Sequence, residues 1–235
     1  MIKKGDFVEL DYTGRIKDDK IIFDTTQEEV ARASENYNPK FLYKPAIICV
    51  GEHQLIKGLD DALIGKNPSK FTIEIKAEDG FGKKSPSLLK LLPMKLFMKD
   101  KIQPFPSLEV NVDGQLGIVR SVSGGRVIVD FNHPLASKEL VYDVDLIRVV
   151  TDPIEQIRSI LEMIQLPFAT IDIEEEKAII LLKTKLPEEM LNEMSEHIKK
   201  LTKLKSVTFS IAEPKEKKHE AKDAELKEEH HAKQD

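Results

Sequence analysis

Apolar and polar residues alternate in several short runs of the first 150 residues, and this period of two restricts the fold more than any other feature of the chain. The pattern occupies residues 6–12, 71–75 and 140–146. It places one face of each run on a core and the other in solvent, as in antiparallel strands. Two short stretches, residues 27–34 and 56–63, read as helices. We therefore expect an α+β domain in which an antiparallel sheet wraps on a short helix.

Local signals mark the ends of these elements. The pair Thr13 and Gly14 is expected to turn the chain toward a second strand at residues 20–23. Thr25 and Thr26 are each followed three residues later by a glutamate. This spacing predicts capping boxes at the start of the first helix.

The composition shifts after Gly82, and the shift indicates a separate unit. Leucine and methionine crowd residues 88–98. Three strand-like runs follow, separated by the hairpin signals Asp113-Gly114 and Gly124-Gly125: residues 108–112, 117–122 and 126–131. We predict a small β-rich insert at residues 83–131, which interrupts a domain formed by residues 1–82 and 132–150.

A third segment has a different element order. Asp152 is a good N-cap, and Pro153 fits the first position of a helix. Two strands, a second helix from Pro187 and a last strand then predict an α-β-β-α-β domain at residues 152–212. Residues 213–235 carry lysine, glutamate and alanine with almost no apolar side chains, so we expect a charged, disordered tail.

Composition limits the classes of function. A net charge of −5 argues against a dedicated nucleic-acid binder. No apolar run approaches the roughly 20 residues that cross a bilayer, and residues 1–6 are not followed by the apolar stretch of a signal peptide. The single cysteine, Cys49, excludes an internal disulfide and a cysteine-rich metal site. These features predict a cytoplasmic protein that binds neither nucleic acid nor membrane.

The usual catalytic motifs are missing from the sequence. It has no P-loop, no GxGxxG after a strand, and neither HExxH nor CxxC. His53, His133 and His197 occur singly and read as structural. The tail histidines could bind a divalent metal, although a solvated tail is the favoured interpretation: His219, His230 and His231. We expect no cofactor and no metal site.

Aromatic residues recur beside glycine turns. Tyr12 precedes the pair Thr13 and Gly14, and Phe81 lies between two glycines. Phe23 precedes Asp24, and Tyr142 lies in the last strand of the first domain. Each of these residues alone reads as part of a core, but the ordered set is specific.

Four blocks of sequence resemble FKBP-type prolyl isomerases, in the order that the family has. They are VELDYTGR with FDTT (8–15, 23–26), VGEHQLIKGL with ALIG (50–59, 62–65), AEDGFG (77–82), and NHPLA with LVYDV (132–136, 140–144). The interruption between Gly82 and Asn132 lies where SlyD-like members carry an insert-in-flap domain that binds unfolded chain. The C-terminal segment is similar to the extension of long archaeal-type members.

The resemblance implies a proline pocket and names its lining. The pocket would contain Tyr12, Phe23, Asp24, Ile56, Leu59, Phe81 and Tyr142, with Leu55, Leu135 and Ala136 at the rim. Three of these depart from the family pattern: Phe81 replaces the usual Tyr, Leu59 a frequent Trp, and Tyr142 the usual Phe. In the insert, Met94, Phe97 and Met98 are expected to form an exposed groove for substrate, the alternative being that they belong to the core of a small β unit.

The implied function is cis–trans isomerisation of X–Pro bonds in unfolded or partly folded polypeptides, with chaperone activity in the insert. The alternative is a chaperone or interaction module with a weak or vestigial pocket. Asp24 would orient the pocket side chains or accept a hydrogen bond from a tyrosine, or else cap the helix that follows it. The C-terminal domain could mediate homodimerisation, substrate capture or partner docking.

Overall fold

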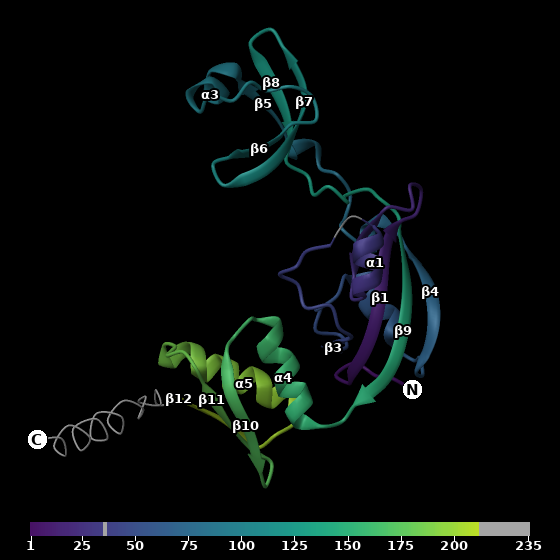
Figure 1. Cartoon of the computed structure of the whole chain (residues 1–235), viewed down its shortest axis with the longest axis vertical. Coiled ribbons are helices and arrows are strands. Elements are labelled where there is room, and N and C mark those ends of the chain that lie inside the picture. Colours follow the sequence, from purple (N-terminus) through teal and green to yellow (C-terminus); the bar gives the residue numbers. More distant parts are fainter. Residues whose placement is uncertain (35–36, 212–235) are drawn as a thin grey trace, which may run out of the picture. The chain divides into compact units, whose positions relative to one another are not determined.

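The computed structural model describes residues 1–34 and 37–211 of the chain (Figure 1). The chain divides into two compact units, Met1–Asp152 and a second that begins at Pro153. The described residues form three sheets, two in the first unit and one in the second. This mixture of mostly antiparallel sheets and few helices confirms the predicted α+β class. The tail expected at residues 213–235 lies outside the described residues, and the predicted domain boundaries stay a prediction.

The larger sheet of the first unit is built around β1 (Phe7–Ile16). Its neighbour along almost the whole length is β9 (Leu140–Val150), which pairs on its other edge with β4 (Ser69–Ile75). The free edge of β1 is shared by two short strands, β2 (Ile22–Thr25) and β3 (Ala46–Cys49). All of these pairs are antiparallel.

The core of this domain lies between the sheet and α2 (Lys57–Leu63). Leu59 and Leu63 of α2 are fully buried, and they join alternate residues of the strands, such as Val8 and Leu10. The remaining helical elements of this domain are α1 (Glu28–Ala33) and a 3₁₀ turn, η1 (Ala77–Asp79); a second 3₁₀ turn, η2 (Pro86–Leu88), lies in the segment that leads into the insert. The period-two pattern therefore predicted the strands because each has one buried face.

Two predictions about turns and caps are wrong. Thr13 and Gly14 do not turn the chain; both lie inside β1, opposite Thr25 and Asp24 of β2. Nor do the threonines cap α1, because its N-cap residue is Gln27 and makes no side-chain capping bond. The Thr25 hydroxyl instead donates to the Tyr12 carbonyl at 3.1 Å. The Thr26 hydroxyl likewise donates to an Asp11 carboxylate oxygen at 2.6 Å. These hydroxyls therefore tie β2 to β1.

The insert contains a four-stranded sheet with its own core. Its strands are β5 (Leu89–Pro93), β6 (Glu109–Val112), β7 (Gln115–Ser123) and β8 (Arg126–Asp130), in the spatial order β5-β8-β7-β6. Both predicted hairpins are confirmed, and the four residues at their tips have positive φ: Asp113, Gly114, Gly124 and Gly125. A short helix, α3 (Met94–Lys99), follows β5. The sequence pattern assigned neither β5 nor α3, because the run of Leu and Met has no clear period.

The second unit has the predicted α-β-β-α-β order. Its elements are α4 (Pro153–Met163), β10 (Phe168–Glu174), β11 (Lys177–Leu182), α5 (Glu188–Thr202) and β12 (Ser206–Ile211). β11 is central, antiparallel to β10 and parallel to β12. Within the part of the chain that the structure describes, no helix is long and apolar enough to span a bilayer.

Candidate active site

A cavity of about 140 Å³ opens in the first domain, between the main sheet and α2. Its lining comes from five separate segments and consists of Tyr12, Asp24, Gln54, Leu55, Ile56, Leu59, Phe81 and Tyr142. A larger hollow of about 590 Å³ lies at the turn between β10 and β11, lined by Glu174, Glu175, Lys177 and Ile179. Most of its walls are exposed charged side chains, so we place the chemistry in the smaller, aromatic cavity.

Strand pairing brings the aromatic residues together. Gly14 of β1 lies opposite Tyr142 of β9 on one side and Asp24 of β2 on the other. A β-carbon at Gly14 would lie 2.8 Å from the Tyr142 ring and 3.0 Å from the Phe23 ring. Glycine is therefore needed here for close approach, because a side chain would push both rings out of place.

Three aromatic rings line the cavity, those of Tyr12, Phe81 and Tyr142, and a fourth, that of Phe23, packs against two of them. The ring centroids of Tyr12 and Tyr142 are 5.9 Å apart, and Phe23 meets Tyr142 edge-on at 5.9 Å. Phe23 also meets Phe81 edge-on at 6.0 Å. Edge-to-face contacts at these separations are favourable for aromatic pairs and fix the rings relative to one another. Phe23 itself supports the lining residues from behind.

Asp24 supplies the charge of the site. The Tyr12 hydroxyl donates to its carboxylate at 3.1 Å. Much of the Asp24 side chain is open to solvent at the rim, but the surrounding protein partly desolvates the carboxyl and so raises its pKa. The hydrogen bonds from Tyr12 and the Thr25 backbone lower the pKa by a smaller amount. Burial, and then the nearby Asp24 charge, also raise the pKa of Tyr12 and of Tyr142. Both hydroxyls therefore stay protonated at neutral pH. Asp24 does not cap α1, whose N-cap residue is Gln27.

Two polar residues of the site were not predicted. Gln54 lines the cavity, and its side-chain oxygen accepts the Cys49 backbone N–H at 2.7 Å. Asp60 is buried in α2 and accepts the backbone N–H groups of Gly51, at 2.9 Å, and His53, at 3.3 Å. These bonds hold the loop that carries Leu55 and Ile56 into the cavity. A single Asp in a short helix gives no periodic signal, so the sequence could not reveal this role.

The remaining predicted site residues are not gathered at the cavity. Leu135 is partly buried, and Ala136 is 3% exposed, so it offers almost no surface to a substrate. The exposed groove predicted in the insert is wrong for Phe97, which is 2% exposed and packs in the core of the insert beside Met94. Met98 is 67% exposed. The two residues differ because one side of α3 packs on the sheet: Phe97 lies on that side, and Met98 lies on the side that faces solvent.

The described residues contain no group of three or more His, Cys, Asp or Glu side chains that could hold a metal ion. The arrangement can instead enclose a small apolar ring between aromatic walls, with neutral hydroxyls and one carboxylate at the edge. Nothing in it provides an activated nucleophile, and the chemistry that suits it is selective binding.

Comparison with known proteins gives consistent matches. Residues 90–135 match a family model described as "FKBP26, IF domain". The chain is 34% identical over 145 residues to the short-type peptidyl-prolyl cis-trans isomerase of Methanocaldococcus jannaschii, covering 61% of this chain and 91% of that protein. It is 32% identical to the FKBP-type 16 kDa isomerase of Escherichia coli K12, over 45% of this chain and 74% of the relative. The SlyD isomerase of Haemophilus influenzae is 31% identical, over 46% and 58%.

Proposed function

This chain belongs to the FKBP-type peptidyl-prolyl cis-trans isomerase family, and from that premise we propose that the cavity around Tyr12, Phe81 and Tyr142 is its active site. The observation that carries the proposal is the convergence of aromatic rings from β1, β9 and the turn after η1 on one cavity. The proposed substrates are X–Pro bonds in unfolded or partly folded polypeptides, and the proposed location is the cytoplasm.

The proposed mechanism needs no covalent step. Rotation about an amide bond is slow because resonance must be broken, with a barrier of about 18–20 kcal/mol. The twisted transition state has lost this resonance and has less charge separation than the planar amide. Aromatic walls that exclude water therefore bind the twisted form better than the planar one, and this difference lowers the barrier. Phe81 has no hydroxyl, so its part is packing alone.

Asp24 and Tyr12 have a supporting role in this mechanism. The carboxylate holds the Tyr12 hydroxyl at the rim, and through it the ring that forms one wall. Because Tyr12 stays protonated, its hydroxyl cannot introduce a second negative charge beside the amide. This keeps the cavity favourable for the less polar transition state.

The test is the cis-to-trans rate of a short X–Pro peptide with the intact chain, Asp24→Ala and Phe81→Ala. We expect catalysis by the intact chain and a loss of roughly tenfold or more in kcat/KM for each variant. Val149→Ala is the matched control, since Val149 lies in β9 but outside the cavity. Full turnover by both pocket variants would refute the assignment. No turnover by the intact chain would leave a chaperone built on an inactive pocket.

We further propose that the insert binds unfolded chain on the outer face of β5 and β8. Leu91 pairs with Ile128 across these strands, and both are exposed, as is Leu89 two residues earlier. Among the described residues β5 is an edge strand of its sheet, so an extended segment can hydrogen-bond to it while its apolar side chains cover the leucines. This face takes the role that the sequence assigned to Met94, Phe97 and Met98.

The C-terminal unit keeps its three proposed roles, among them homodimerisation. Its sheet has two free edges within the described residues, β10 and β12, and Ile179 is exposed on the central strand. These features are compatible with each role and favour none of them.

A further inference from the structure

Two linkers join the insert to the isomerase domain, and hydrogen bonds tie them to each other. The Ser137 backbone N–H donates to the Gly82 carbonyl at 2.7 Å, and the Lys84 N–H donates to the Ser137 hydroxyl at 2.8 Å. Further along, the Ser85 N–H donates to the Asn132 side-chain oxygen at 2.7 Å, and the Asn132 amide donates back to the Ser85 carbonyl at 3.1 Å. The two linkers are therefore held side by side.

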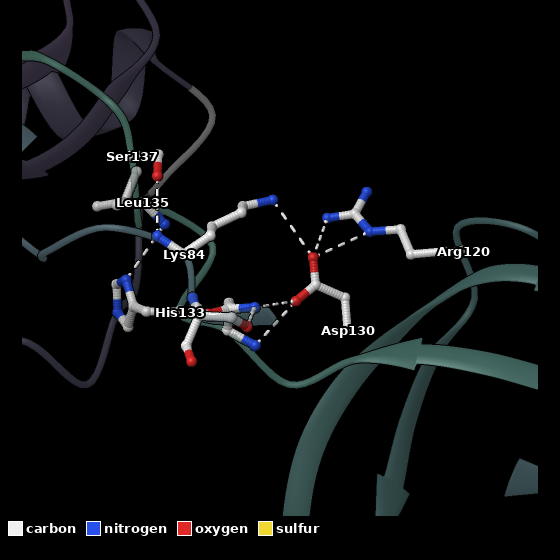
Figure 2. A network of polar contacts seen from close by, with 8 residues as sticks. Lys84, Arg120, Asp130, His133, Leu135 and Ser137 are labelled. Carbon is white, nitrogen blue, oxygen red and sulfur yellow. Dashed lines mark hydrogen bonds and ion pairs between the residues drawn. The ribbon is translucent and has the colours of Figure 1, made fainter. Parts of the chain in front are cut away.

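Asp130 lies at the insert end of this arrangement and contacts three segments (Figure 2). One carboxylate oxygen accepts from Arg120 of β7, at 2.8 and 3.1 Å, and from Lys84 of the first linker, at 3.3 Å. The other oxygen accepts the backbone N–H and the side-chain amide of Asn132, in the second linker, at 3.0 and 2.7 Å.

This carboxylate is 4% exposed, so its charge is stabilised by these partners and not by water. Burial alone would raise the pKa of Asp130, but the bonds from Asn132, Arg120 and Lys84 outweigh it and hold the pKa well below the usual range. Asp130 is thus a fixed charge through the whole neutral range, and its partners keep their positions with it.

The pocket end of the same linker is His133, the residue after Asn132. Its ring stacks on the Phe81 ring, with centroids 4.4 Å apart and an angle of 2° between the planes. Its Nδ1 atom accepts the Leu135 N–H at 3.2 Å, which orients the imidazole (Figure 2). Since Phe81 lines the cavity, the backbone that Asp130 holds at Asn132 leads directly to the residue behind a pocket wall.

The other neighbour of Asp130 is the proposed chain-binding face. Leu89 of β5 pairs directly with Asp130 of β8, and Leu91 and Ile128 form the next pair on that face. A polypeptide on these side chains would therefore lie beside the carboxylate and its Arg120 partner.

We propose that Asp130 is a positioning residue that couples the chain-binding face of the insert to the Phe81 wall of the isomerase pocket. It acts by holding the linkers in the geometry that stacks His133 on Phe81. This inference rests on the proposed function. Substrate bound on the insert then changes the shape of the pocket, and by the same coupling free energy the shape of the pocket changes the affinity of the insert for substrate.

The test is a double-mutant cycle of Asp130→Asn and Phe81→Ala, measured as kcat and KM for a short X–Pro peptide. Asp130→Asn keeps the shape of the side chain but removes the charge that binds Arg120 and Lys84. We expect about a 3- to 30-fold fall in turnover, mostly in kcat, and almost no additional fall when Phe81 is already Ala. Chemical shifts of the His133 ring protons should move in Asp130→Asn, because ring stacking sets them.

Asp113→Asn is the matched control, because it removes a carboxylate from an exposed hairpin tip of the same insert. It should leave turnover and the His133 shifts unchanged. If Asp130→Asn does not fold, Arg120→Gln weakens the same cluster and should show the same non-additivity with Phe81→Ala.

A folded Asp130→Asn chain with unchanged turnover and unchanged His133 shifts would overturn the coupling, as would effects that simply multiply with those of Phe81→Ala. Failure of the proposed function itself would look different, since the unaltered chain would then not accelerate the peptide at all.

Discussion

Gly14 offers the sharpest test of how the pocket is built. Replacing it with Ala adds one methyl group between the Tyr142 and Phe23 rings, at 2.8 and 3.0 Å from their nearest atoms. Carbon atoms do not approach this closely without repulsion, so the rings must shift by several tenths of an ångström. β1 is held by β2 and β9 on its two sides, so its backbone cannot move away easily.

The expected effect on stability is moderate. Overpacking of this kind costs about 1–3 kcal/mol. Alanine restricts the unfolded chain more than glycine, which returns about 0.4–1 kcal/mol because Gly14 lies within β1 and does not have a positive φ. The net free energy of unfolding should therefore fall by about 0.5–2 kcal/mol, equivalent to a few degrees in Tm for a domain of this size.

The effect on catalysis should be larger than the effect on stability. The Tyr142 ring lines a cavity of only about 140 Å³, and the Phe23 ring packs against Phe81, which also lines it; small misplacements at a reacting centre can cost about 10²-fold. We expect kcat/KM for a short X–Pro peptide to fall between tenfold and a hundredfold. Thermal unfolding and the peptide assay, performed on the same preparation, give both quantities.

Ala178→Val is the matched control for this variant. Ala178 is fully buried in β11, in the second unit and outside the isomerase domain. The added methyl groups should destabilise that unit to a similar degree but leave short-peptide turnover within about twofold. Wild-type turnover by Gly14→Ala, or an equal loss of turnover in both variants, would show that the two rings do not depend on this clearance.

Three further predictions concern charge, the binding face and the rim loop. Because the folded pKa of Asp24 is raised above its unfolded value of about 3.9, its contribution to stability is full below that pH and is lost as the pH rises through the folded value. Asp24→Asn should therefore flatten this part of the curve of Tm against pH without lowering Tm at pH 7; a clear drop at pH 7 would contradict the sign. Leu91 is 55% exposed, so Leu91→Lys should keep short-peptide turnover but lose most of the acceleration of a proline-limited refolding protein. The exposed Leu116 gives the control Leu116→Lys, and equal losses in both would argue against the β5–β8 face. Asp60→Ala leaves the N–H groups of Gly51 and His53 without their acceptor and should lower the free energy of unfolding by about 2–4 kcal/mol. Urea unfolding measures this change, and an unchanged urea midpoint would show that the carboxylate does not hold the loop.

The sequence predicted those elements in which local pattern and tertiary burial agree. The alternation in β1, β4 and β9 follows directly from one buried face, and the two hairpin dipeptides follow from the positive φ that their tips need. The Leu- and Met-rich run gave no secondary-structure prediction, because its apolar residues fit a strand period and a helix period equally well. The sequence pattern therefore could not show where β5 ends and α3 begins.

Gly14 shows a second kind of failure. A glycine after Thr13 reads as a turn, but here the missing side chain provides room for rings that arrive from β2 and β9. Only the tertiary structure distinguishes these two uses of glycine.

The pocket residues were predicted from the family resemblance, and seven of the eight residues that line the cavity belong to the predicted lining or its rim; Gln54 is the exception. The supports behind them were not found. Asp130 meets Lys84 across 46 positions of sequence, and His133 reaches Phe81 across the same insert. No local pattern records such a pairing, because it depends on two linkers that come together only in the folded chain.

We propose above that proline isomerisation takes place within this aromatic cavity. Two-dimensional exchange NMR of an X–Pro peptide, with a catalytic amount of the intact chain, measures the cis–trans rate at equilibrium while a parallel titration follows the ring signals of Tyr12, Phe81 and Tyr142. We expect accelerated exchange together with shifts of all three rings at the same peptide concentration. Accelerated exchange with unmoved rings would place the activity elsewhere in the chain, and no acceleration would contradict the isomerase assignment of this cavity.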